Sequence, residues 1–222
     1  MKLGVLFSGG KDSCLATWIA KKEGYEISCL ISIQSSNKNS FMFHTPSILS
    51  TRNQAKAMRI PLIVQETPGE KEFELEDLES VIARAHKKFK IEGIVTGAVE
   101  SVYQSSRIQK ICNKLNLECF NPLWQKNQKE LLYDLVKNNF EVIVVGVFAE
   151  PLNDKFLGRK IDEKFIKEME ELEKKYKINP AGEGGEYETF VLNCPIFKEK
   201  LEIKSFEDFG EKNSWRRELE IK

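Results

Sequence analysis

The chain has 222 residues, and its 34 basic and 34 acidic side chains give a formal net charge of zero at pH 7. This balance argues against bulk nucleic acid as the main partner, because proteins that bind it usually carry a positive excess. No apolar run approaches the ~18 residues of a membrane span, and the N-terminus has no signal-peptide pattern, so we expect no membrane association and a cytoplasmic location.

The first half of the chain alternates strand and helix patterns. Runs rich in Ile, Val and Leu predict strands at residues 3–7, 27–33, 61–65 and 93–98. Helical patterns at 13–22, 47–58 and 74–89 fall between them. The alternation predicts an α/β domain whose parallel sheet is covered by helices on both faces, with ligands bound at the carboxyl ends of the strands.

The pattern changes after Pro122-Leu123-Trp124. We expect a helix at 128–137, a strong strand at 142–148, a charged helix at 162–176 and short strands at 189–192, 201–203 and 217–221. These elements predict a smaller α+β domain. We place a boundary near Gln125, which divides the chain into a ligand-binding domain at 1–125 and a substrate-recognition domain at 126–222.

The run Ser8-Gly9-Gly10-Lys11-Asp12-Ser13 connects the first predicted strand to the first predicted helix. Two glycines let the backbone N–H groups approach an anion, and the helix N-terminus adds further donors, so the run predicts a phosphate site. It is not the common nucleotide loop, because Val5 stands where that motif needs its first glycine. The alternative is a turn that binds no ligand.

A second unusual run is Gly182-Glu183-Gly184-Gly185-Glu186-Tyr187-Glu188-Thr189. Its three carboxylates are suited to binding a cation, orienting an amine or holding a second metal, and its glycines allow a ligand to approach the backbone. The alternative for this run is a solvated acidic turn.

The first run resembles the PP-loop of the N-type ATP pyrophosphatases, and together the two runs resemble the diphthine–ammonia ligase family in its single-chain archaeal form. Segments between them resemble the family too, namely Phe43-His44-Thr45-Pro46 with Gln54-Ala55, Gly97-Ala98, Tyr103-Gln104 with Arg107, and Leu157-Gly158-Arg159. The resemblance implies a Rossmann-like (HUP-type) sheet that binds ATP and Mg²⁺. It also implies that the carboxylate of diphthine, a modified histidine on translation elongation factor 2, attacks the α-phosphate of ATP. Ammonia then displaces AMP and leaves the amide of diphthamide.

On this interpretation the nucleotide is bound by Ser8, Gly9, Gly10, Lys11, Ser13, His44, Gly97 and Ala98. The residues expected to act in catalysis are Lys11, Asp12, Ser13, Arg107 and Glu186, with Asp12 also holding Mg²⁺. Two of these assignments have plain alternatives, since Arg107 is also suited to a surface salt bridge and His44 to a structural role.

The expected substrate contacts are Tyr103, Gln104, Glu183, Gly184, Gly185, Glu186, Tyr187, Glu188 and Thr189. Because quaternary ammonium groups are bound by aromatic faces with carboxylates nearby, we expect Tyr187 and the glutamates to bind the trimethylammonium group of diphthine.

Two other functions stay open. Many PP-loop relatives modify tRNA, often with paired cysteines, but the five cysteines of this chain show no C-x-x-C spacing. A non-catalytic nucleotide-binding protein is the third alternative. The chain has no room for a glutaminase domain, so we expect ammonia from solution or from a partner. A homodimer also stays open, since the Phe-rich segment Ser205–Gly210 is suited to an interface as well as to internal packing.

Overall fold

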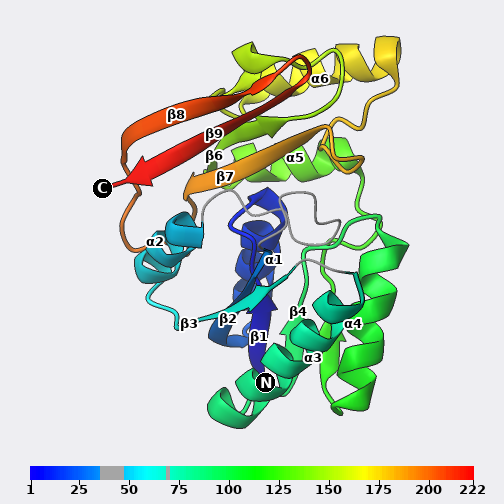
Figure 1. The fold of residues 1–222 in the computed structure, drawn as a ribbon, viewed down its shortest axis with the longest axis vertical. Coiled ribbons are helices and arrows are strands. Elements are labelled where there is room, and N and C mark those ends of the chain that lie inside the picture. Colours follow the sequence, from blue (N-terminus) through cyan, green and yellow to red (C-terminus); the bar gives the residue numbers. More distant parts are fainter. Residues whose placement is uncertain (36–47, 69–70) are drawn as a thin grey trace.

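The computed structural model describes residues 1–35, 48–68 and 71–222. The first part of the chain forms a sheet of five parallel strands with four helices (Figure 1). Its elements are β1 (Lys2–Leu6), α1 (Lys11–Lys22), β2 (Glu26–Ser35), α2 (Ile48–Met58), β3 (Leu62–Thr67), α3 (Lys71–Phe89), β4 (Gly93–Val95), α4 (Val102–Lys114) and β5 (Glu118–Phe120).

The strand order is β3-β2-β1-β4-β5, which confirms the predicted Rossmann-like α/β fold. Apolar side chains of α1 and α2 pack in one core cluster, and those of α3 and α4 pack in another on the opposite face. Strands β2 and β3 follow on one side of β1, whereas β4 and β5 lie on its other side, so the order of strands reverses between β1 and β4. Ligands of such sheets bind beyond the carboxyl ends of the strands at this point. The Ser8–Ser13 run follows β1 and therefore lies there.

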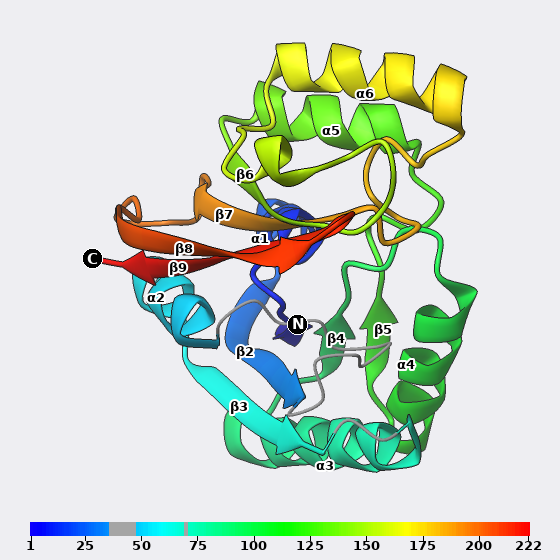
Figure 2. The same ribbon diagram turned by 45° about the horizontal axis from the view of Figure 1, so that its top comes forward.

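The second part forms an antiparallel sheet in the order β7-β6-β9-β8. Its elements are α5 (Gln128–Lys137), β6 (Glu141–Val147), η1 (Asp154–Phe156), α6 (Glu163–Tyr176), β7 (Tyr187–Asn193), β8 (Ile203–Glu211) and β9 (Ser214–Ile221). Figure 2 shows α5 and α6 stacked on one side of this sheet, while α2 lies on the other side. The predicted α+β architecture is confirmed.

The two sheets share one hydrophobic core. Leu15 of α1, Leu131 of α5, Phe165 of α6 and Val191 of β7 belong to the same buried cluster. Trp18 of α1 also meets Phe140 edge-on, with ring centroids 6.0 Å apart. Helix α1 is thus packed on both sheets, which fixes the Ser8–Ser13 run relative to β7. The boundary between 1–125 and 126–222 stays a prediction.

Helix α4 and strand β5 were not among the predicted elements, and of the predicted ones strand β8 differs most in extent. The sequence indicated a strand at 201–203, whereas β8 runs from Ile203 to Glu211 and all nine residues are exposed. A strand without a buried face carries no alternation of apolar and polar residues, so periodicity does not reveal it. Strand β4 is shorter than predicted, because the chain leaves the sheet after Val95 and approaches α1.

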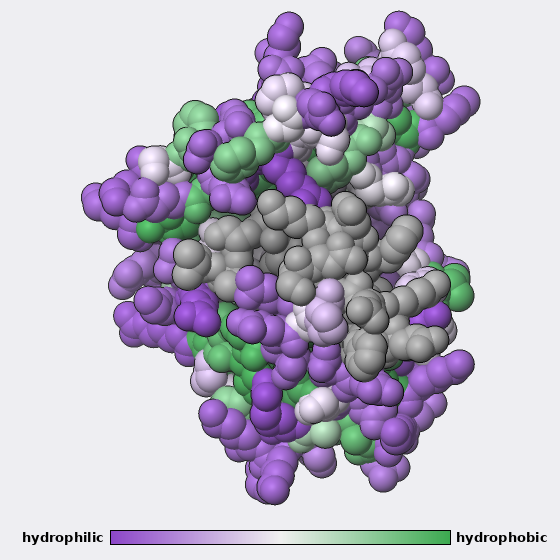
Figure 3. Space-filling model, viewed as in Figure 1, coloured by the Kyte–Doolittle hydropathy of each residue, from purple (hydrophilic) through white to green (hydrophobic). Residues whose placement is uncertain are grey.

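Hydrophilic side chains dominate the part of the described surface that is visible in Figure 3, with hydrophobic groups near the β8–β9 hairpin at upper left. None of the described helices is long and apolar enough to cross a lipid bilayer.

Candidate functional site

The turn after β1 has the conformation expected of an anion-binding loop. Gly9 has φ +81°, in the left-handed region that favours glycine. Gly10 is the N-cap of α1 and has no side chain to cap this helix end; the Thr189 hydroxyl accepts the N–H of Lys11. Uncapped first-turn N–H groups are donors for an anion. The Ser8 and Ser13 hydroxyls lie together, with their oxygens 3.2 Å apart.

Lys11 is at the centre of a buried charge cluster. Its residue is 4% exposed, and its Nζ donates to Asp12 Oδ2 at 2.7 Å and to Glu183 Oε1 at 3.5 Å. Burial alone lowers the pKa of Lys11, but the carboxylates of Asp12 and Glu183 outweigh it and leave this pKa raised. Lys11 is therefore a permanent cation at the N-terminal end of α1. The two runs singled out in the sequence meet at this residue.

Glu183 has an unusual ionisation. Burial raises the pKa of its carboxyl to about 7, although Lys11 opposes the shift. The cluster thus contains one lysine that stays charged and one carboxyl that changes its charge near neutral pH. A carboxyl of this kind is suited to binding a cation or exchanging a proton.

Strand β7 holds the loop from the other side. The Thr189 hydroxyl accepts the Lys11 backbone N–H at 3.0 Å, and Val191 N–H donates to Gly9 O at 3.2 Å. The Gln54 side chain, fully buried on α2, donates from Nε2 to Gly9 O at 2.9 Å and to Val191 O at 2.8 Å. Gln54 therefore clamps the loop to β7.

Glu186 has a different place from the predicted one. Its Oε1 accepts from Asn179 N at 2.7 Å and Asn179 Nδ2 at 2.9 Å, and its Oε2 accepts from Gly184 N at 2.9 Å. The residue is buried and both oxygens are engaged by the 179–185 segment. These contacts suit a positioning role, in which Glu186 shapes the segment carrying Glu183, and its catalytic role stays a prediction.

Tyr187 is buried as well, and its hydroxyl donates to Pro180 O at 2.8 Å. The Phe165 ring packs edge-on against the Tyr187 ring, with the two centroids 5.8 Å apart, and Lys11 Nζ lies 6.0 Å from the Tyr187 centroid. This burial argues against the expected contact between the ring and a trimethylammonium group. Glu188 faces Arg216, with an N···O distance of 3.9 Å, and burial raises its pKa.

The glycines of the site differ in the structural feature that each one allows. A Cβ on Gly97 would lie 2.8 Å from the backbone carbon of Asp12, so this glycine admits the first turn of α1, and its contact with the nucleotide stays a prediction. Ala98 is buried next to it. Gly184 and Gly185 are exposed on the glutamate-rich loop, and Gly185 has φ +83°.

Arg107 is turned back onto its own helix. Its NH1 donates to Tyr103 O at 3.1 Å, and its guanidinium lies 3.3 Å from the centroid of the Tyr103 ring. The Gln104 backbone N–H donates to the Ser101 hydroxyl that caps α4. No hydrogen bond or ion pair between described residues joins Arg107 to the Lys11 cluster. Its catalytic role stays a prediction, and His44 lies outside the described residues.

Sequence reasoning assigned no role to Gln54, Gln128 or Asn179. Gln128 Oε1 accepts from Ala181 N at 3.1 Å, and its Nε2 donates to Asn179 Oδ1 at 3.1 Å, so α5 supports the glutamate-rich loop. One signal for Gln54 was present: it shares a helical face with the buried Thr51 and Met58, where a large polar side chain needs a specific partner.

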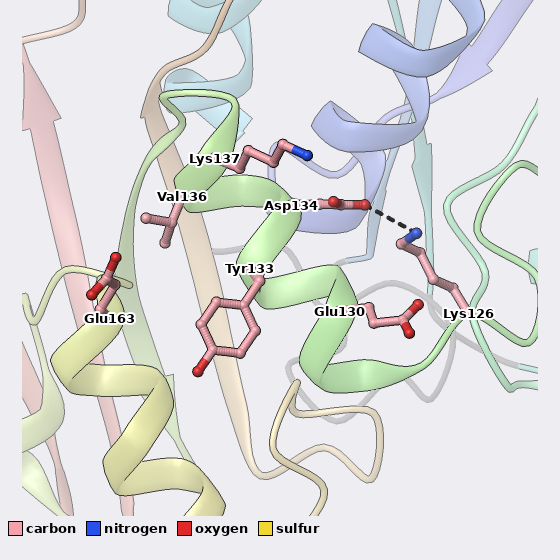
Figure 4. A pocket seen from close by; sticks show the side chains of 7 residues that line it. All are labelled: Lys126, Glu130, Tyr133, Asp134, Val136, Lys137 and Glu163. Carbon is pink, nitrogen blue, oxygen red and sulfur yellow. Dashed lines mark ion pairs between the residues drawn. The ribbon is translucent and has the colours of Figure 1, made fainter.

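Figure 4 shows a surface pocket of about 560 Å³ along α5. It is lined by Lys126, Glu130, Tyr133, Asp134, Val136, Lys137 and Glu163. None of these is a predicted site residue, and Lys126 pairs with Asp134 at 3.0 Å. The pocket is thus separate from the site formed by the two loops.

The described residues contain no group of three or more His, Cys, Asp or Glu side chains arranged to hold a metal ion. Mg²⁺ does not need such a group, because proteins usually hold it through one or two carboxylates together with substrate phosphates and water. Asp12 is 28% exposed at the loop and fits that requirement.

Comparisons with known proteins agree with this arrangement. The family model of the diphthamide synthase N-terminal domain matches residues 1–119, and that of the C-terminal domain matches 127–220. The diphthine–ammonia ligase of Mus musculus is 36% identical over 93% of this chain and 84% of its own length, and that of Homo sapiens is 34% identical over the same shares.

The Schizosaccharomyces pombe enzyme of that name is 34% identical, but this chain covers only 36% of it. Solved structures resemble the chain more distantly. A Methanocaldococcus jannaschii protein described as a subunit of tRNA methyltransferase gives a TM-score of 0.46 at 21% identity, covering 88% of this chain and 98% of that one. The matches to both domain models and the identity to the animal enzymes show that this chain belongs to the diphthamide synthase family.

Proposed function

We propose that this protein catalyses the ATP-dependent amidation of diphthine on translation elongation factor 2. A diphthine carboxylate oxygen attacks the α-phosphorus of ATP, the bond to the β-phosphate breaks, and pyrophosphate leaves. Ammonia then attacks the acyl carbon of the adenylate and AMP leaves with the shared oxygen. The observation that carries the proposal is the Lys11 cluster, which joins the two family-typical runs at the N-terminal end of α1.

The loop after β1 binds the phosphates in this proposal. Gly9 and Gly10 bring the backbone close, and the Ser8 and Ser13 hydroxyls supply further donors. Lys11 neutralises the charge that builds up on the departing pyrophosphate. Such fixed donors and charges are usually the largest contribution to catalysis, since they need no reorganisation during the reaction.

Asp12 is the residue proposed to hold Mg²⁺. The ion would supply positive charge that stabilises the phosphates and the leaving pyrophosphate. The Asp12 carboxylate accepts hydrogen bonds from Lys11 Nζ in this structure. When the ion and the phosphates bind, the two side chains must therefore separate or contact the same phosphate.

We assign to Glu183 the binding of the incoming ammonium. Its carboxyl lies beside Lys11, where the adenylate forms, and its raised pKa lets it take a proton near neutral pH. Glu186 and Asn179 hold the loop in shape for it. Because the Tyr187 ring is buried, the trimethylammonium group of diphthine must bind elsewhere.

The proposed partners are elongation factor 2 carrying diphthine and ammonia, and the cytoplasmic location stays a prediction. The test measures AMP release from ATP and Mg²⁺ with and without ammonium, using elongation factor 2 with diphthine and the unmodified factor as control. AMP formation that needs both ammonium and diphthine supports the proposal. AMP formation that ignores the factor and responds to tRNA contradicts it.

A further inference from the structure

Strand β8 forms a long solvent-exposed edge of the antiparallel sheet. All nine of its residues are exposed, and within the described part of the chain it pairs with β9 alone. Three of its apolar side chains are open to solvent: Phe206 is 57% exposed, Phe209 44% and Ile203 38%. In Figure 1 this edge lies at the upper left, with no other ribbon beyond it.

Edges of this kind are normally blunted, because unpaired backbone groups and apolar side chains promote pairing with another chain. Short length, proline, bulges and charged side chains are the usual devices. β8 has an irregular register between Ile203 and Ser205, and it carries charges at Lys204, Glu207, Asp208 and Glu211. It is nonetheless nine residues long and contains no proline. An edge with two exposed phenylalanines therefore calls for a partner strand.

We propose that two copies of this chain form a homodimer by antiparallel pairing of β8 with β8 about a twofold axis at Phe206. In this register Phe206 faces the other Phe206, and Ile203 faces Phe209. Lys204 faces Asp208 twice, once on each side of the axis. Directly opposed apolar and oppositely charged pairs stabilise an antiparallel sheet.

Neighbouring registers are less favourable. An axis at Glu207 sets that carboxylate against its own copy, and like charges directly opposite destabilise a sheet. An axis at Ser205 leaves Phe209 outside the paired segment. The charge pattern of β8 thus favours one register, and an interface of this symmetry is self-complementary as a twofold dimer requires.

Two charges at the edge already have partners within one chain. Lys204 Nζ donates to Glu220, and Arg217 donates to both oxygens of Asp208 at 2.7 and 2.8 Å. Pairing of β8 strands therefore extends the existing ion pairs of Lys204 and Asp208, and it sets Glu207 opposite Ser205 of the other copy.

A groove beside the β8 edge can accommodate the Phe206 ring of the second copy. It has a volume of about 760 Å³ and lies between α2 and the β8–β9 hairpin, with Phe206, Arg52 and Lys56 among its lining residues. The guanidinium of Arg217 lies 3.9 Å from the centroid of the Phe206 ring and fixes it at the rim. A second Phe206 facing the first would enter this groove.

The dimer leaves the candidate site open. β8 and β7 are the two opposite edges of the sheet, and the Ser8–Lys11 loop is held by β7. Pairing through β8 would produce a continuous eight-stranded sheet with one site at each end. The inference does not depend on the proposed function.

The first test is the molar mass of the full chain in solution, measured by light scattering and by sedimentation over a range of micromolar concentrations. We expect twice the 25.6 kDa of one chain. Phe206→Asp should weaken the dimer about 30-fold or more, because central aromatic residues dominate such interfaces. Phe206 is exposed in the monomer, so circular dichroism should show an unchanged fold.

The second test addresses the register. Lys204→Glu alone and Asp208→Lys alone each create two like-charge pairs across the axis and should weaken the dimer. An equimolar mixture of the two variants creates only opposite-charge pairs, so it should recover a dimer with one chain of each kind. Lys114→Glu on α4 changes the net charge by the same amount as Lys204→Glu and should leave the dimer intact.

A monomer at every concentration overturns the proposal, and so does a dimer that tolerates Phe206→Asp. Failure of the mixed variants to recover the dimer overturns the register. If the chain is monomeric and Phe206→Asp instead weakens binding to elongation factor 2, the edge belongs to the protein substrate and the homodimer is wrong.

Discussion

The two loops of the site use their polar groups in opposite ways. The Ser8–Ser13 loop keeps its two serine hydroxyls together, and it is held from outside by Gln54 and Thr189. The glutamate-rich loop distributes its three carboxylates in three directions, toward Lys11, toward its own backbone and toward Arg216. Glutamates within six positions of one another thus have different tasks, because burial and partners decide the task of a side chain.

The largest effect should come from Lys11, the residue at which the two loops meet. Lys11→Met removes the only cation of the cluster formed with Asp12 and Glu183, so we expect single-turnover AMP release to fall at least about 100-fold. Lys22→Met at the far end of the same helix is the control and should retain activity. Near-normal AMP release by Lys11→Met would show that the loops do not act on phosphate.

Glu186→Gln tests the carboxylate that accepts hydrogen bonds from its own loop. Its oxygens accept three N–H groups, and an amide at this place turns a donor toward some of them. We expect the free energy of unfolding to fall by about 3 kcal/mol, measured by urea denaturation. Glu202→Gln removes a carboxylate from an exposed ion pair and should change it by less than about 1 kcal/mol. Equal effects of the two substitutions would refute the positioning role.

Glu183→Gln tests the carboxyl directed at Lys11 through its pH dependence. The folded pKa is raised from 4.5 to about 7, so the folded state binds the proton more tightly and wild-type stability decreases as pH rises between these values. In Glu183→Gln no carboxyl titrates at this position, so the stability of the variant does not fall in this way as pH rises. Its free energy of unfolding relative to wild type should therefore rise by about 2 kcal/mol from about pH 5 to about pH 8. A pH-independent difference would contradict the raised pKa.

Gln54→Met tests the external clamp on the first loop and should have the smallest effect. The change removes two buried hydrogen bonds at nearly constant side-chain volume. We expect a loss of about 1–2 kcal/mol in stability and a KM for ATP that rises more than kcat falls. Asn53→Met, the preceding residue on α2, is the matched control. A lower stability with unchanged kinetics would make Gln54 a packing residue only.

Much of the first sheet could be predicted because its first four strands and first three helices carry local signals, whereas the sequence analysis listed neither α4 nor β5. Buried parallel strands are continuous apolar runs, and their helices have one apolar face, so β2 and α3 appear in the sequence close to their observed positions. Helix α5 matches its predicted range in full. The phosphate-type turn also follows from local chemistry, since two glycines before a helix have few other uses.

The sequence by itself determined the fold class, the turn after β1 and, through the resemblance of its two runs, the family. Only the tertiary structure decided which side chains meet. Lys11 and Glu183 are 172 positions apart, and Gln54 is 137 positions from the Val191 carbonyl that it binds. Such contacts depend on the packing of α1 between two sheets, and no local pattern encodes that packing. The same cause turned Glu186 and Tyr187 inward and left β8 exposed, because a side chain's neighbours are fixed only when the sheets come together.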